Sequence, residues 1–238
     1  TVVFVSLLGY VAIAWAIIAI RFDETLSQTK PMPSPVNMLR QYRELVTSRY
    51  FISFASIGWL NFSLMITTVS VMPFIMQDQI GMTSDEYAMW ALIPAFGMLT
   101  GTSICNRVRP IIGSKKMLLC TPVLHLASAL WFFFCPLEPL YLMFGQLLMI
   151  LGNAIALPCA QAMVMQPYKK QAGAAAAMSG GGQMIISSIV SMALVTLGLN
   201  QAWHLSFVII AFAAITLGNI VRGFSTHEAL VQKERQAV

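Results

Sequence analysis

The chain has 238 residues, of which 58% are hydrophobic and only 10% are charged, and its mean hydropathy is +0.74. A soluble domain carries about 25% charged residues, so this composition excludes an ordinary soluble protein. The net charge of +5 comes from basic residues scattered over separate loops, which disfavours nucleic-acid binding and fits membrane topology and contact with anionic lipid.

Seven stretches are long and apolar enough to cross a bilayer, which takes roughly 20 mostly apolar residues. They are 1–20, 51–76, 88–105, 117–135, 140–165, 173–198 and 203–221. When these stretches alternate in direction, all 14 Lys and Arg residues fall on one side of the membrane. Basic residues in short loops stay cytoplasmic. We therefore predict an all-α integral membrane protein with seven transmembrane helices and a cytoplasmic C-terminus.

The first span begins directly at Thr1 and lacks the basic start and cleavage site of a signal peptide. Either it is a true first helix with its amino end outside, or the chain is cut from something longer, and we favour the second interpretation. After it, a proline cluster over 31–35 precedes apolar residues at i, i+3 and i+4 spacing over 38–46. This pattern predicts a stiff linker followed by a short helix on the membrane surface.

These observations predict four segments along the chain. They are a transmembrane helix over 1–20, a cytoplasmic central loop over 21–50, a six-helix bundle over 51–221 and a cytoplasmic tail over 222–238. Within the bundle, the six spans divide as three plus three. Thr83 and Glu86 have capping-box spacing, so a helix is expected to begin there.

Uncharged polar residues recur on one face of two spans. The residues that we predict to line a cavity are Phe54, Asn61, Met65, Thr68, Gln146, Met149, Asn153 and Gln161. Met and aromatic side chains repack around ligands of different shape, and an amide fixes one or two polar contacts. This combination suits amphipathic ligands. The alternative, equally open at this point, is that the amides only bond neighbouring helices.

Small residues form a second pattern on two other spans. They are Gly97 and Gly101 on the third span, and Gly180, Gly181 and Gly182, followed by Gln183, on the sixth. Small residues let helices approach closely, and glycine weakens a helix enough for it to bend. We predict either plain close packing or sliding contacts between the halves of a larger bundle.

Titratable chemistry is sparse in the spans. No Asp, Glu, Lys or Arg lies in the middle of any of them, and His125 is the one titratable side chain well inside. A lone histidine is more often packing than a proton relay. The four cysteines lack paired or metal-ligand spacing. No catalytic constellation converges, so we predict neither an enzyme nor a metal site.

Three segments resemble a known family of transporters. Glu24-Thr25-Leu26 resembles the end of the sixth helix of major facilitator drug:proton antiporters. The run from Gly101 to Lys116 resembles a degenerate copy of that family's cytoplasmic loop motif, with Asn106, Arg107, Lys115 and Lys116 at its charged positions and Asn106 in place of the acid. The run 173–183, Gly-Ala-Ala-Ala-Ala-Met-Ser-Gly-Gly-Gly-Gln, resembles the eleventh helix of the bicyclomycin and chloramphenicol resistance (Bcr/CflA) type.

The resemblance implies helix six plus the C-terminal six-helix bundle of a bacterial inner-membrane multidrug exporter. Such a protein works by alternating access, takes its energy from the proton gradient and has no cofactor. Asn61, Gln146 and Asn153 would contact the drug. The partner would be a missing N-terminal half that carries the proton-coupling residues, so we expect the chain alone not to complete a transport cycle.

Two alternatives remain. The first keeps the fold but moves a specific metabolite, such as a sugar derivative or a peptide, because neutral amides do not reveal a substrate class. The second is a seven-helix receptor, against which 203–221 holds no lysine for a retinal Schiff base.

Overall fold

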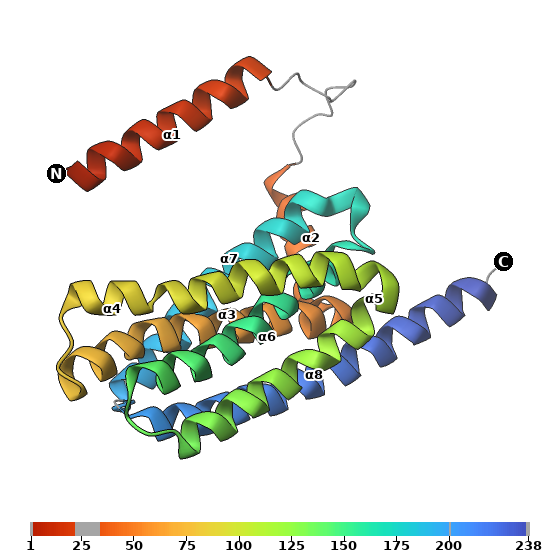
Figure 1. Cartoon of the computed structure of the whole chain (residues 1–238). Helices are drawn as coiled ribbons and strands as arrows, with labels where there is room; N and C mark the ends of the chain where they lie inside the picture. The colour runs from red at the N-terminus through yellow and green to blue at the C-terminus, as the bar shows by residue number, and fades with distance from the viewer. Residues whose placement is uncertain (1, 22–33, 200, 237–238) are drawn as a thin grey trace. The chain divides into compact units, whose positions relative to one another are not determined.

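The computed structural model describes residues 2–21, 34–199 and 201–236, and all regular secondary structure in these ranges is helical (Figure 1). The chain divides into two compact units, Thr1–Asn37 and Met38–Val238. The predicted all-α fold class is confirmed.

The first unit contains α1 (Val2–Arg21), a 20-residue helix whose one charged residue, Arg21, lies in its last turn. A helix of this length rises about 30 Å, which matches the hydrocarbon core of a bilayer. Its apolar side chains are exposed, with Phe4 and Trp15 both more than 70% accessible. Those side chains are covered by nothing in their own unit, as expected of a helix in lipid.

The division between the units falls inside α2 (Pro35–Thr47), the helix predicted in the central loop. The Ser34 hydroxyl accepts a hydrogen bond from the backbone of Asn37 and begins the helix. Within the second unit, Leu45 is completely buried while Met38, Leu39 and Val46 remain exposed. The apolar face of α2 is therefore only partly covered by the bundle.

The second unit is a bundle of long helices. In chain order they are α3 (Arg49–Phe74) with its π-helical end η1 (Ile75–Gln79), α4 (Ser84–Trp90), α5 (Leu92–Phe134), α6 (Pro139–Met165), the short η2 (Lys169–Gln171), α7 (Ala172–Thr196) and α8 (Ala202–Gln236). Over the described residues of both units, six helical stretches have the length and composition of membrane spans. One of them, Ser84–Phe134, covers 51 residues.

Helix α5 accounts for two of the predicted spans. Its 43 residues would measure about 65 Å if straight, roughly twice the hydrocarbon thickness. The helix is broken at Gly113, where φ is 82° and ψ is 158°, a conformation that glycine adopts without strain. Figure 1 shows the chain folding back at this point. The arms 92–112 and 114–134 thus correspond to the spans predicted over 88–105 and 117–135.

The predicted helix start at Thr83 is confirmed in detail. The Thr83 hydroxyl accepts from the backbone N–H of Glu86, and the Glu86 carboxylate accepts from the backbone N–H of Thr83 at 2.9 Å. Two of the free donors at the beginning of α4 are satisfied in this way.

Basic residues gather at one end of the bundle, which we call the basic end. Arg49 and Arg222 line one cavity there, and Lys115 pairs with Glu228 of α8. The Ser48 and Tyr168 hydroxyls lie 2.7 Å apart, and the Tyr50 hydroxyl donates to the Met163 carbonyl at 2.9 Å. These bonds join the beginning of α3 to the end of α6. The cytoplasmic assignment of this end stays a prediction.

Candidate functional site

A cleft of about 270 Å³ lies between α3, α6 and α7, and we call it the three-helix cleft. Its lining comprises Phe54, Ala55, Gly58, Leu157, Ala160, Gln161, Val164, Ser179, Gly180 and Gln183. Two predicted groups meet here, because Phe54 and Gln161 belong to the proposed cavity residues and Gly180 and Gln183 to the small-residue helix. The cleft is apolar with two amides on its wall, which is the usual make-up of a small-molecule site.

Three residues hold the wall of the cleft in place. The indole N–H of Trp59 donates to the Ser179 carbonyl at 2.8 Å, and the Ser179 hydroxyl donates to Oε1 of Gln161 at 2.9 Å. Helix α7 is thereby bonded to both α3 and α6. The second bond orients the Gln161 side chain, whose amide NH₂ stays available as a donor.

The glycine at 182 permits this arrangement. A Cβ atom there would lie 2.7 Å from Cζ2 of Trp59, which is closer than any ordinary carbon–carbon contact. By contrast, Gly180 and Gly181 are exposed, and a Cβ atom at either would meet nothing within 4 Å. Gly182 is therefore required for close packing within the bundle, whereas Gly180, which lines the cleft, and Gly181 have space for a Cβ atom.

Phe54 forms the part of the cleft closest to the basic end. Its ring lies 4.9 Å from that of Tyr50 and 5.2 Å from that of Phe224, measured between centroids. It also covers Gly223, where a Cβ atom would come within 2.9 Å of the ring. The Phe54 side chain is itself fully buried, so these contacts hold its ring in the packed wall of the cleft.

Most of the other predicted cavity residues lie in the packed interior of the second unit. Asn61, Thr68, Gln146, Met149 and Asn153 are each at most 2% exposed, and Met65 is half-buried against the same core. They do not line the three-helix cleft. Their predicted contact with a substrate stays a prediction, and the contacts seen are those of helix packing.

The Asn61 amide illustrates this packing. It donates to the Ile57 carbonyl at 2.7 Å and reaches the Thr216 hydroxyl at 3.4 Å, so it links α3 to α8. The Thr68 hydroxyl donates to the Leu64 carbonyl of its own helix. The Asn153 amide approaches the Met149 sulfur at 3.2 Å.

His125 is fully buried where the second arm of α5 meets α6. Its imidazole lies over Gly152, where a Cβ atom would come within 2.7 Å of the ring. The Met149 carbonyl and the Asn153 side chain are the polar neighbours of the imidazole. Neither ring nitrogen makes a hydrogen bond to any residue that the structure describes. The interior around His125 is thus polar and incompletely bonded within the protein.

Gly97 and Gly101 pack closely against a neighbouring helix of this bundle, and their predicted contact with another half stays a prediction. An added Cβ atom would overlap a Leu147 methyl at Gly97, and at Gly101 it would lie 2.7 Å from the Ala154 Cβ. Both glycines are buried between α5 and α6, so their surface is already used inside this bundle.

The charged loop motif surrounds the break in α5. Asn106, Arg107, Lys115 and Lys116 are all exposed. The Lys115 ammonium bonds the Glu228 carboxylate at 2.9 Å and lies 5.4 Å from the Phe224 ring centroid. This motif therefore links α5 to α8 in the described part of the chain.

The comparison with known proteins decides the family. The family model described as Major Facilitator Superfamily matches residues 54–234, about three quarters of the chain. The chain belongs to this superfamily. Its members are membrane transporters rather than enzymes, so the prediction of a transporter fold is confirmed.

Several curated relatives of this major facilitator chain are multidrug resistance proteins named MdtL. The protein from Escherichia fergusonii is 25% identical over 194 residues, which cover 81% of this chain and 49% of the relative. Those from Escherichia coli O157:H7 (strain EC4115 / EHEC) and Shigella dysenteriae serotype 1 are 24% identical over the same coverage. The chain spans about half the length of these relatives. No solved structure matches it significantly.

Sequence reasoning missed the residues that shape the cleft. Trp59 and Ser179 are 120 positions apart, and no periodic pattern in either helix marks them as partners. A tryptophan on an apolar helix needs a partner for its indole N–H, which was the one available signal.

Proposed function

We propose that this chain forms part of a proton-driven multidrug exporter, and that the three-helix cleft supplies the drug-facing wall of its C-terminal half. The observation that carries the proposal is the joining of Phe54, Gln161 and Gln183 in one cleft of a chain whose relatives are multidrug resistance proteins. An apolar cleft with few fixed polar contacts tolerates ligands of different shape.

The part of α7 that lines the cleft also has a sequence that permits bending. Gly180 and Gly181 are unobstructed, and a glycine pair lowers the stability of α7 at this level. In alternating access, one bundle rocks against another around a site at their interface. We propose that α7 bends next to the cleft when a second bundle moves against it.

The wider setting follows from the same proposal. The basic end lies in the cytoplasm of a bacterium, the acidic loops around Asp85 and Glu138 lie outside, and the C-terminus is cytoplasmic, because basic loops are retained inside. The partner is an N-terminal half of the same transporter, and the Bcr/CflA type is the subfamily that the run 173–183 resembles.

Everted membrane vesicles test the proposal directly. They would carry the product of the complete reading frame in which the chain is encoded, and efflux of ethidium and of chloramphenicol would be followed after energising with a respiratory substrate. We expect energy-dependent transport of both drugs that collapses with a protonophore. Replacing Gln161 by Ala should alter the apparent affinity of the drugs unequally, since only some drugs accept a hydrogen bond from this amide.

The matched control is Gln166→Ala, which removes an exposed amide near the same end of α6, outside the cleft. Transport of a single metabolite, with no drug efflux and no effect of protonophore on drug accumulation, would replace this proposal with the facilitator alternative.

A further inference from the structure

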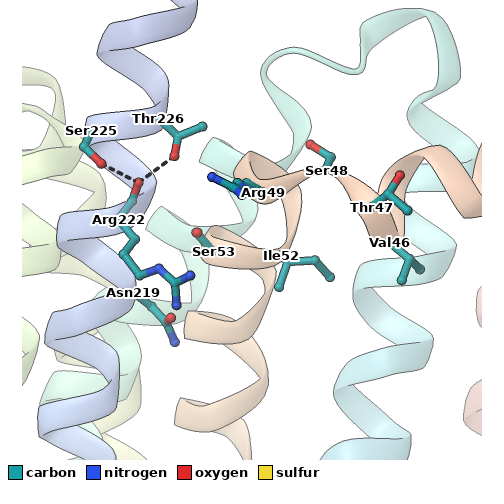
Figure 2. A pocket seen from close by; sticks show the side chains of 10 residues that line it. All are labelled: Val46, Thr47, Ser48, Arg49, Ile52, Ser53, Asn219, Arg222, Ser225 and Thr226. Carbon is teal, nitrogen blue, oxygen red and sulfur yellow. Dashed lines mark hydrogen bonds between the residues drawn. The ribbon is translucent and has the colours of Figure 1, made fainter.

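A second and larger cavity, of about 370 Å³, lies at the basic end between α8 and the junction of α2 with α3 (Figure 2). We call it the basic-end cavity. It is lined by Val46, Thr47, Ser48, Arg49, Ile52, Ser53, Asn219, Arg222, Ser225 and Thr226. Apart from Ser48, none of these residues takes part in an interaction described so far, and none lines the three-helix cleft.

Two arginines give this cavity its charge. Figure 2 shows the Arg49 side chain pointing from α3 toward α8, and the Arg222 guanidinium pointing from α8 toward α3, with Ser53 between them. The lining contains no carboxylate. Among the described residues, the one salt bridge is Lys115–Glu228, so neither arginine is neutralised by an acid that the structure places.

A buried donor is aimed at the same space. Ser53 is only 8% exposed, and its hydroxyl makes no hydrogen bond to any residue that the structure describes, although it lines the cavity. A hydroxyl that opens into the cavity is a donor for any ligand that accepts hydrogen bonds. Asn219 adds an amide beside Arg222.

The backbone adds to the positive potential. Helix α3, 26 residues long, begins at this cavity with Ser48 as its N-cap. The N-terminus of a long helix carries a partial positive charge that favours anions. The cavity therefore combines several donors: two guanidinium groups, a buried hydroxyl, an amide and a helix N-terminus. No carboxylate in its lining balances their positive charge.

We propose that the basic-end cavity binds a phosphate group, held by Arg49 and Arg222 and accepting a hydrogen bond from Ser53. Guanidinium groups bind phosphate oxygens in a planar, often bidentate geometry. Two sources carry this group: an anionic phospholipid headgroup and soluble phosphate.

The surroundings favour the lipid. Val46 and Ile52 supply apolar surface within the cavity, and Val221, one residue before Arg222, is 60% exposed on α8. The amphipathic helix α2, with Leu39 72% exposed, leads directly into the site. Basic pockets between spanning helices at one membrane face are a recognised setting for anionic headgroups.

Native mass spectrometry of the detergent-purified chain tests this proposal without any substitution. The probes are phosphatidylglycerol and phosphatidylcholine with identical acyl chains. We expect one phosphatidylglycerol to be retained in preference to phosphatidylcholine. If 10 mM-scale inorganic phosphate displaces that lipid, the site takes soluble phosphate as well; if it does not, the lipid is the source. Equal retention of both lipids would overturn the proposal.

Substitutions then locate the site. Arg49→Gln and Arg222→Gln should each weaken phosphatidylglycerol binding by about tenfold or more, since hydrogen bonds to charged groups are the strong ones. Arg49→Lys and Arg222→Lys keep the charge and should weaken binding less. The matched control, Arg43→Gln, removes the same charge from exposed α2 outside the cavity and should leave preferential binding intact.

Equal losses of phosphatidylglycerol binding in the control and in the cavity variants would show a general effect of charge. That result would overturn the proposed site. Circular dichroism and elution as a single species establish that each variant is folded. Because drug transport is not measured here, a failure of this proposal is distinct from a failure of the proposed function.

Discussion

The contact between Gly182 and Trp59 predicts opposite effects for two neighbouring substitutions. In Gly182→Ala the new Cβ would begin 2.7 Å from Cζ2 of Trp59 and 3.0 Å from its Nε1. Ordinary carbon contacts are about 3.5–4.0 Å, so the indole must move by roughly 1 Å. That movement strains or breaks the 2.8 Å bond to the Ser179 carbonyl. In Gly181→Ala the Cβ meets nothing within 4 Å.

The magnitudes follow from three contributions. Replacing a mid-helix glycine by alanine stabilises the helix by about 1 kcal/mol in both variants, so this contribution cancels in their comparison. Overpacking costs about 1–3 kcal/mol, and an interhelical hydrogen bond in a membrane contributes about 0.6–1.7 kcal/mol. We therefore expect Gly182→Ala to be less stable than Gly181→Ala by about 2–5 kcal/mol.

Thermal unfolding in one detergent, followed by tryptophan fluorescence and by loss of the monodisperse peak, measures this difference. A double-mutant cycle isolates the contact: in a Trp59→Phe background the ring is smaller and has no N–H, so Gly182→Ala should cost much less. An equal cost of Gly182→Ala in both backgrounds would refute the argument that the indole is what requires glycine here.

Three further substitutions test the packing. Gly101→Ala should destabilise the bundle by about 1–3 kcal/mol, because its Cβ would lie 2.7 Å from that of Ala154. The control Gly58→Ala, whose Cβ meets nothing within 4 Å, should not destabilise it. Equal thermal midpoints for the two variants would contradict the placement of Gly101. Thr83→Ala removes the cap of α4 and should cost about 1 kcal/mol, seen as faster amide exchange over 84–90; unchanged exchange would show that the cap is not needed. Lys115→Gln breaks an ion pair whose side chains are 55% and 63% exposed, so the loss should be under about 1 kcal/mol; a larger drop in thermal midpoint would mean that this pair matters more than its exposure implies.

Sequence patterns predicted which segments form helices better than they predicted what surrounds each helix. Apolar runs located the spans, and the Thr83–Glu86 spacing predicted a helix start that the structure reproduces in both hydrogen bonds. The two spans on either side of Gly113 are joined through a single residue with non-helical φ and ψ rather than through a longer loop. No apolar pattern reveals this, because glycine is equally compatible with a loop and with a single break.

The polar faces show where the reasoning reaches its limit. Helical periodicity establishes that Asn61 and Thr68 share a face, but not whether a neighbouring helix or an open cavity covers it. Asn61 reaches Thr216 on α8, 155 residues away, and only the tertiary structure brings them together. Gln161 lies one turn beyond Pro158 and is exposed, so the same helix presents its amides in different surroundings.

Substrate protection at residue 161 is the most direct test of the central claim that drugs contact the three-helix cleft. The experiment uses the complete reading frame with Cys120 and Cys135 replaced by serine, and compares maleimide labelling of Gln161→Cys with that of Asn106→Cys, an exposed position outside the cleft. We expect a transported drug to slow labelling at position 161 and to leave labelling at position 106 unchanged. Unchanged labelling at position 161, in a variant that still exports the drug, would contradict it.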